Sequence, residues 1–126
     1  MAKENFRKFT TSSGIEALGG KSADNNEQII KQADNNEYIL HTAKPGSPFV
    51  NLKADEEDVS EKDLQEAAIF CARYSQDWRD NKKEVLVHVF KARDVYKNKG
   101  MELGTFGVKN FKEIKVKKID IENFGK

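Results

Sequence analysis

The longest periodic stretch of the chain is a mostly apolar face that repeats at three- and four-residue steps between positions 60 and 81. Its members are Leu64, Ala67, Ala68, Cys71, Ser75 and Trp78. This spacing predicts one amphipathic helix, which begins in a capping box of Ser60 with Asp63 and ends at residues 81–83. Because several of these side chains are small, we expect the helix to lie close against a sheet.

Short apolar runs elsewhere predict strands, since each is bounded by glycine, proline, serine or asparagine turns. The runs are 6–11, 15–18, 38–42, 49–52, 85–90, 102–108 and 114–121. The run at 85–90, VLVHVF, is apolar on both alternations, which is typical of a central strand. A shorter helix is expected after the N-cap Ser22, with Ile29, Ile30 and Ala33 on its buried side. This order predicts an α+β fold, with a mostly antiparallel sheet and two helices packed on it.

Composition limits the class of protein. The 126 residues fit a single domain with a core of about residues 6–118, and 37% of them are hydrophobic. The sequence shows neither a run of about 18 apolar residues nor an apolar N-terminal leader, so no membrane span and no secretion signal are expected. The single cysteine, Cys71, favours a reducing compartment, and we expect a cytoplasmic protein.

Charge is segregated along the chain, although the net charge is only +1. Residues 54–66 hold seven acids and one base, whereas residues 79–118 hold twelve bases and five acids. Such segregation can steer a polyanion to one face of a near-neutral protein.

The bases of the second half fall into two groups. Lys91, Arg93, Lys97 and Lys99 flank Tyr96, and bases beside an aromatic ring are typical of phosphate contact with some base stacking. The other group is Lys109, Lys112, Lys115, Lys117 and Lys118. For the last three of these, an edge strand protected by lysines is a serious alternative.

Residues 14–22, GIEALGGKS, end like a phosphate-binding P-loop but are one residue too long. The interior Ile-Glu-Ala-Leu has strand character, and the extra residue moves Lys21 out of register with Gly14. A hairpin followed by a capped helix is therefore favoured over a nucleotide site. Residues 19–22 would still lie at a helix N-terminus, which favours an anion such as a nucleic acid backbone.

The two histidines and the cysteine lie far apart in sequence and form no zinc pattern, so we expect no metal and no cofactor. His41 precedes a rigid loop at 44–48. It is either a structural histidine at a strand end or, helped by Lys44, a polar contact to RNA. His88 is expected to be a buried, hydrogen-bonded histidine of the central strand. Cys71 is expected to pack in the core, since no base is placed to activate it.

Five motifs occur in order along the chain. They are the hairpin FRKFTTSSGIEALGG; Lys21, Asn26 and Glu27 in KSADNNE; His41 with Gly46, Ser47 and Pro48; Ala67, Ala68, Ser75 and Trp78; and Val95, Lys97, Gly100, Gly104, Thr105 and Phe106. Together they resemble the NFACT RNA-binding domain family (NFACT-R) over residues 6 to about 111. Ser22 stands where the family usually has Asp, which weakens any role for that acid but still allows a helix cap.

The resemblance implies a non-catalytic domain that binds RNA. In long members of the family this domain accompanies others on the large ribosomal subunit, near tRNA, during quality control of stalled translation. We therefore expect a stand-alone module that contacts tRNA or ribosomal RNA, with the large subunit as a further partner and neither DNA nor a membrane bound. The expected RNA contacts are Lys21, Ser22, Asn26, His41, Lys44, Arg93, Lys97, Lys99 and Lys109.

Two other functions stay open. One is a protein-interaction module on the translation machinery, which would use the acidic segment or an exposed sheet edge. The other, less favoured, is a small enzyme that acts on a phosphorylated substrate at the 19–22 turn with His41 as its base.

Overall fold

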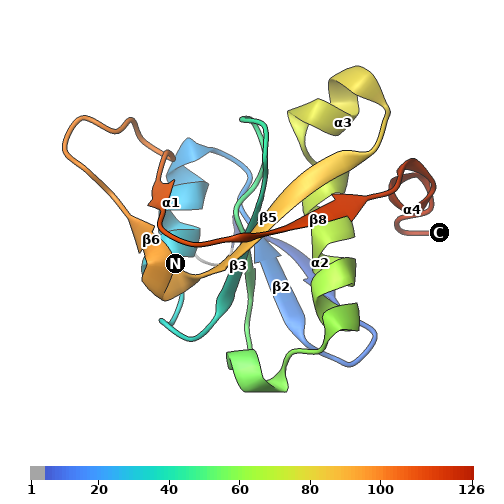
Figure 1. Cartoon of the computed structure of the whole chain (residues 1–126), viewed down its shortest axis with the longest axis horizontal. Coiled ribbons are helices and arrows are strands. Elements are labelled where there is room, and N and C mark those ends of the chain that lie inside the picture. Colours follow the sequence, from blue (N-terminus) through green and yellow to red (C-terminus); the bar gives the residue numbers. More distant parts are fainter. Residues whose placement is uncertain (1–4) are drawn as a thin grey trace.

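The computed structural model describes residues 5–126 and centres on a six-stranded antiparallel sheet (Figure 1). The strand order is β1-β2-β4-β3-β5-β8, so β1 and β8 form the edges. A separate ribbon pairs β6 with β7. The strand bounds are β1 Arg7–Thr10, β2 Glu16–Gly19, β3 Tyr38–Thr42, β4 Val50–Leu52, β5 Val85–Lys91, β6 Val95–Tyr96, β7 Gly107–Val108 and β8 Lys112–Val116.

Helices cover both faces of the sheet. The bounds are α1 Ala23–Gln32, α2 Glu61–Arg73, α3 Gln76–Asn81 and α4 Lys118–Glu122, with 3-10 turns at η2 Glu56–Asp58 and η3 Ala92–Asp94. α1 and the β6–β7 ribbon lie on one side of the sheet, and α2 runs along the other (Figure 1). The expected α+β fold with a mostly antiparallel sheet is confirmed. Within residues 5–126, none of the helices has the length and apolar character needed to cross a membrane.

Strand side chains alternate between two hydrophobic cores, one on each face of the sheet. In β3, Leu40 joins the core under α2, whereas its neighbour Ile39 joins the core that Ile29 of α1 completes. In β5, Val87 packs on the α2 side and Phe90 on the α1 side. The interior position that VLVHVF predicts for this strand is therefore confirmed.

The prediction of a single helix over 60–81 is wrong, because α2 ends at Arg73 and a second helix, α3, begins at Gln76. Ser75 causes the break. Its hydroxyl donates to the Ala72 carbonyl oxygen (2.7 Å) and accepts from the Trp78 N–H (3.1 Å), so it ends one helix and caps the next. Periodicity missed the break because Ser75 and Trp78 are both buried, as one continuous face also requires.

The strands expected over 102–108 and 114–121 are both longer than those observed. Only Gly107 and Val108 pair, as β7, because turns curl the chain before them and Gly104 has a φ of 80°. β8 ends at Val116, and the chain then forms α4, whose Ile121 is fully buried. A short apolar run fits a strand and a short helix equally well, which explains the second error.

Cys71 is fully buried in the core under α2, as the sequence predicts. Burial raises the pKa of its thiol to about 12. The side chain therefore stays protonated and acts as a small apolar group.

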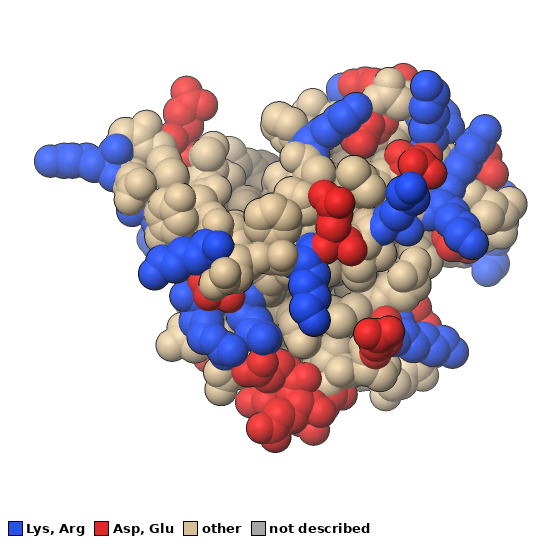
Figure 2. Space-filling view, viewed as in Figure 1, with Lys and Arg blue, Asp and Glu red and all other residues tan. Residues whose placement is uncertain are grey.

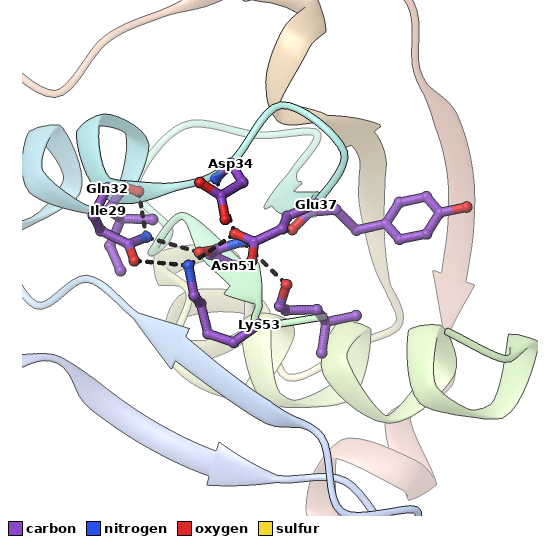
Figure 3. A network of polar contacts seen from close by, with 8 residues as sticks. Ile29, Gln32, Asp34, Glu37, Asn51 and Lys53 are labelled. Carbon is purple, nitrogen blue, oxygen red and sulfur yellow. Dashed lines mark hydrogen bonds and ion pairs between the residues drawn. The ribbon is translucent and has the colours of Figure 1, made fainter. Parts of the chain in front are cut away.

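A polar network fastens the end of α1 to the sheet (Figure 3). The fully buried Asn51 accepts a hydrogen bond from Gln32 Nε2 at 2.7 Å, and its own amide donates to the Tyr38 carbonyl oxygen at 3.2 Å. Lys53 Nζ then bridges Gln32 Oε1 (3.0 Å) and Glu37 Oε1 (2.8 Å). Because each polar group here has a partner, the network fixes the direction of α1 over the sheet.

The capping box predicted at Ser60 and Asp63 is confirmed, and it has an additional partner. Asp63 accepts from Ser13 Oγ at 2.6 Å, as well as from the Ser60 N–H at 2.9 Å. Ser13 lies in the β1–β2 turn, so one buried carboxylate joins that hairpin to the start of α2. These hydrogen bonds, that of Ser13 first, lower the pKa of Asp63 to about 2.

We expect Asp63→Asn to lower the free energy of unfolding by about 2 kcal/mol near neutral pH, because it removes a helix cap and charge-assisted hydrogen bonds. The folded-state pKa lies below the unfolded value of about 3.9. The carboxylate therefore stabilises the fold above that value, and its contribution is lost as pH falls from about 4 toward 2. Urea unfolding of both proteins near pH 7 and near pH 2.5 should show the difference shrinking in acid. The exposed Asp58→Asn serves as the control, and a difference independent of pH would contradict this account.

Candidate nucleic-acid interface

A cleft of about 690 Å³ opens where four segments distant in sequence meet. Its walls are the 20–23 turn before α1, the 41–49 segment that includes the end of β3, residues around α3, and the 103–108 segment that leads into β7. In the space-filling view the outline of the molecule is hollowed between the 98–106 loop and α3 (Figure 2).

The cleft is lined without a carboxylate. Its basic and imidazole lining residues are Arg7, Lys21, Arg79, His41 and His88, and no Asp or Glu of the described chain is among the lining residues. The whole chain carries 22 bases and 21 acids, so an acid-free lining is a departure from its composition. A concave surface with bases and no acids favours an anionic ligand.

The 19–22 turn has the geometry expected of a hairpin end and a capped helix, and it is not a P-loop. The Ser22 hydroxyl accepts from the Asn25 N–H (3.1 Å), and the Lys21 N–H donates to Asn25 Oδ1 (3.0 Å). Ser22 is thus the N-cap of α1, as the sequence predicts. The turn presents Lys21 and the first turn of α1 to the cleft.

Gly20 and Asn26 place that turn against the sheet. Asn26 Oδ1 accepts the Phe49 N–H (3.0 Å), and the Gly20 N–H donates to the Phe49 carbonyl oxygen (3.1 Å). A Cβ on Gly20 would lie 1.9 Å from Asn26 Oδ1, so only glycine fits. The oxygen of Asn26 therefore has a structural role, whereas its Nδ2 has no hydrogen-bond partner within residues 5–126, and the residue lines the cleft.

The loop after β3 forms the opposite wall and is held by its own hydrogen bonds. The Thr42 N–H donates to Ser47 Oγ (3.0 Å), and the Gln76 N–H of α3 donates to the Gly46 carbonyl oxygen (2.7 Å). Lys44 projects from this loop with a mostly exposed side chain, 3.6 Å from Asp77. It stands between lining residues without being one itself.

His41 lies at the end of β3, half-buried and within the cleft lining. Its Nδ1 is 2.7 Å from the Thr42 carbonyl oxygen, and its ring packs on Phe49 with centroids 4.4 Å apart. Burial lowers the pKa of His41, so the imidazole is neutral near pH 7.

His88 lies directly across the sheet from His41, in register on β5. The prediction that it is buried is wrong. Its ring is partly exposed, stacks on Phe111 at 4.0 Å and places Nε2 3.1 Å from Glu113 Oε2. The reason is that β8, the next strand, is the edge of the sheet, and the residue that pairs with His88 on it is the half-exposed Glu113.

Lys97 is expected from sequence to contact RNA, but the structure uses its ammonium group internally. Nζ donates to Glu27 Oε2 (2.7 Å) and to the carbonyl oxygens of Glu102 (2.6 Å) and Thr105 (2.8 Å). A lysine has three N–H donors, so all are occupied. Glu27 also accepts the Gly104 N–H at 2.7 Å, and the hydrogen bond from Lys97 lowers the pKa of Glu27. This ion pair holds the 102–106 segment against α1.

Lys97 and the bases Lys91, Arg93, Lys99 and Lys109 all lie outside the cleft lining. Arg93 Nη1 contacts Glu56 Oε2 at 3.0 Å, and Lys91 contacts the other oxygen of Glu56 at 3.0 Å. Glu56 lies in η2, and the acidic side chains of this turn are part of the acidic cluster at the lower end of the view (Figure 2). Lys99 and Lys109 are exposed, and neither has an ion pair within the described residues.

Arg7, Tyr74 and Arg79 are among the lining residues that sequence reasoning missed. The Arg7 guanidinium stacks over the Tyr74 ring, 4.0 Å from its centroid. Arg79 is exposed, and its guanidinium donates two hydrogen bonds to the carboxylate of its neighbour Asp80. Nε lies 2.8 Å from Oδ1 and Nη2 lies 3.2 Å from Oδ2. The position of Arg7 on Tyr74 depends on β1 meeting the end of α2, and no local pattern in the sequence records that contact.

No group of three or more potential metal ligands occurs among residues 5–126. The lining is thus defined by bases, neutral imidazole, backbone N–H groups and aromatic rings. These are the groups that contact phosphate, sugar and base in nucleic acid complexes.

Comparison with known families gives the class. The family described as NFACT protein RNA binding domain matches residues 5–110. The chain therefore belongs to this family, as its sequence motifs predict.

Two relatives extend the comparison. The chain is 34% identical over 73 residues to a protein named Archaeal Rqc2 homolog aRqcH, from Methanocaldococcus jannaschii, and the match covers 57% of this chain and 11% of the relative. It shares its fold with the C-terminal part of the fibronectin/fibrinogen-binding protein from Streptococcus suis, with a TM-score of 0.80 and 20% identity. That match covers 89% of this chain and 45% of the solved one. The chain thus spans less than half of either relative.

We expect Gly20→Ala to lower the free energy of unfolding by about 1–3 kcal/mol, because its Cβ would collide with Asn26 Oδ1. Asn26→Ala should also cost about 1–3 kcal/mol, because it leaves the Phe49 N–H unpaired. In the double variant the collision is gone, so the combined loss should be smaller than the sum by about 1 kcal/mol or more. Denaturant unfolding of all four proteins measures this coupling. Additive losses would show that Gly20 and Asn26 do not act together.

Proposed function

We propose that this chain is a non-catalytic RNA-binding module that holds the phosphate backbone of tRNA or ribosomal RNA in its acid-free cleft. The observation that carries the proposal is the lining itself: Arg7, Lys21 and Arg79 with two histidines and no described Asp or Glu. Membership in the NFACT protein RNA binding domain family supports the same ligand class.

Each wall of the cleft has a proposed role. Lys21 contacts phosphates from the α1 side, together with the free N–H groups of the first turn of α1, and Arg7 contacts them from its place on Tyr74 at the end of α2. Ser22 and the Nδ2 group of Asn26 add neutral hydrogen bonds. Lys44 and Arg79 approach from the opposite wall, where an incoming phosphate competes with the largely buried carboxylate of Asp77 and the exposed carboxylate of Asp80.

The bases outside the cleft are proposed to have different roles. Lys99 and Lys109 flank the 103–108 wall and extend the basic track past the cleft. Lys97 keeps that wall in place through Glu27. Arg93 contacts RNA only if the RNA displaces Glu56 from its guanidinium.

We further propose that the RNA is met in ribosome-associated quality control, in the cytoplasm and on the large ribosomal subunit. The support is the family and the 34% identity to a protein named as an Rqc2 homolog. Because the match covers 11% of that relative, the activity of the whole relative is not transferred to this chain.

Binding to a tRNA transcript should weaken steeply as salt rises, because each phosphate contact releases counterions. The slope of log K against log salt should be about −0.7 to −0.9 per phosphate contacted. Lys21→Gln should make that slope shallower by the contribution of about one phosphate contact, and it should weaken binding several-fold at low salt. Fluorescence anisotropy across a salt series measures both quantities.

Lys115→Gln is the matched control, since Lys115 is an exposed lysine on the edge strand β8, outside the cleft lining. It should leave the slope nearly unchanged. A flat salt dependence in the unmodified protein would exclude phosphate binding and favour the protein-interaction alternative. Equal effects of the two variants would place the RNA elsewhere on the surface.

A further inference from the structure

We infer that His41 accepts a hydrogen bond from a ribose 2′-hydroxyl, so that the cleft distinguishes RNA from nucleic acid without that hydroxyl. The inference rests on the proposed function and assigns this residue the role of reading the sugar. It depends on which nitrogen of the imidazole carries the proton, on whether the other nitrogen is reachable, and on what a nucleic acid can offer it.

The tautomer of His41 follows from its backbone contact. Nδ1 lies 2.7 Å from the Thr42 carbonyl oxygen. A carbonyl oxygen only accepts, so Nδ1 must carry the proton and donate it. In the neutral ring Nε2 then has a lone pair and no proton, and it can only accept a hydrogen bond.

Nε2 is also reachable from the cleft. It has no hydrogen-bond partner within residues 5–126, whereas every fully buried side-chain nitrogen or oxygen of those residues has one. Nε2 is therefore not fully buried, and the residue lines the cleft. The structure thus holds an acceptor at the cleft surface that the protein itself leaves unused.

The direction of this acceptor is fixed before a ligand arrives. The His41 ring packs on Phe49, and Phe49 meets the edge of Phe106 at a centroid distance of 5.5 Å and an interplanar angle of 90°. Together with the Nδ1 hydrogen bond, this packing restricts rotation of the imidazole. A fixed acceptor loses little conformational entropy when it binds.

An acceptor cannot serve the phosphate groups that the neighbouring bases attract, because a phosphodiester carries no proton at neutral pH. The donors of an RNA are the 2′-hydroxyl and the N–H groups of its bases. In a nucleotide the 2′-hydroxyl is adjacent to the 3′-phosphate. One sugar-phosphate unit can therefore present both the anion that Lys21 favours and the donor that His41 favours.

The aromatic rings of the lining argue against a base in this position. One face of Tyr74 is covered by Arg7, Phe49 is covered by His41, and the Lys97 ammonium lies 4.5 Å from the centroid of Phe106. These contacts occupy part of each ring and so reduce the surface that is left for base stacking. The backbone and the sugar are the parts of an RNA that fit the chemistry of the lining.

The test compares a tRNA transcript with the same sequence carrying 2′-fluoro in place of every 2′-hydroxyl, a change that removes the donor but keeps an RNA-like sugar. The unmodified protein should bind the hydroxyl form about tenfold more tightly, as expected for one hydrogen bond. In His41→Asn the amide can still donate to the Thr42 carbonyl oxygen, but no acceptor remains at the Nε2 position. We expect this variant to lose the preference while its affinity for the 2′-fluoro form is unchanged.

His41→Phe gives a second comparison, because it keeps a ring on Phe49 and lacks both nitrogens. It should also bind the two transcripts equally, and thermal unfolding verifies that each variant is folded. A preference that survives in both variants would overturn the role of His41. Absence of a preference in the unmodified protein would overturn it while leaving RNA binding intact. Failure to bind either transcript would overturn the proposed function together with this inference.

Discussion

The contact among Gly20, Asn26 and the backbone of Phe49 is the constraint on which the rest of the site depends. One amide oxygen accepts the Phe49 N–H at 3.0 Å, and the missing Cβ of Gly20 leaves room for that oxygen. This contact brings the N-terminus of α1 against the start of β4. It therefore fixes the separation of two walls of the cleft, the 20–23 turn and the 41–49 segment. Lys21, Ser22 and His41 can then face a single ligand, although the first two lie in the turn before α1 and His41 lies on β3.

The remaining charges are arranged so that few carboxylates meet this surface. Glu56 holds Arg93 and Lys91 at the acidic end of the molecule, and Glu27 holds Lys97 beneath the 102–106 segment. Both acids are thereby paired with bases outside the cleft lining, and the hydrogen bonds from these bases keep the pKa values of the two acids low. A nearly neutral chain can thus present a basic cleft without an overall basic composition.

Elements with a strong local signal were predictable from sequence, and contacts between distant segments were not. Ser22 and Ser60 cap helices as predicted, and β3 has the predicted bounds, because caps and alternation are local properties. Ser75 was read as one more buried position of a long helix, since its two hydrogen bonds are invisible to periodicity. Within the site, Lys21, Ser22, Asn26 and His41 converge, but Arg7 could not be placed because its position depends on Tyr74, which lies far along the chain.

Nuclear magnetic resonance titration with a tRNA transcript tests the central claim most directly, since it locates the bound RNA residue by residue. The account predicts that amide shifts concentrate at residues 20–26, 41–49 and 103–106, around the cleft. Shifts concentrated instead around Glu56 and Arg93, or along β8, would contradict it, because RNA would then bind a surface whose bases are already paired with carboxylates or exposed on a sheet edge.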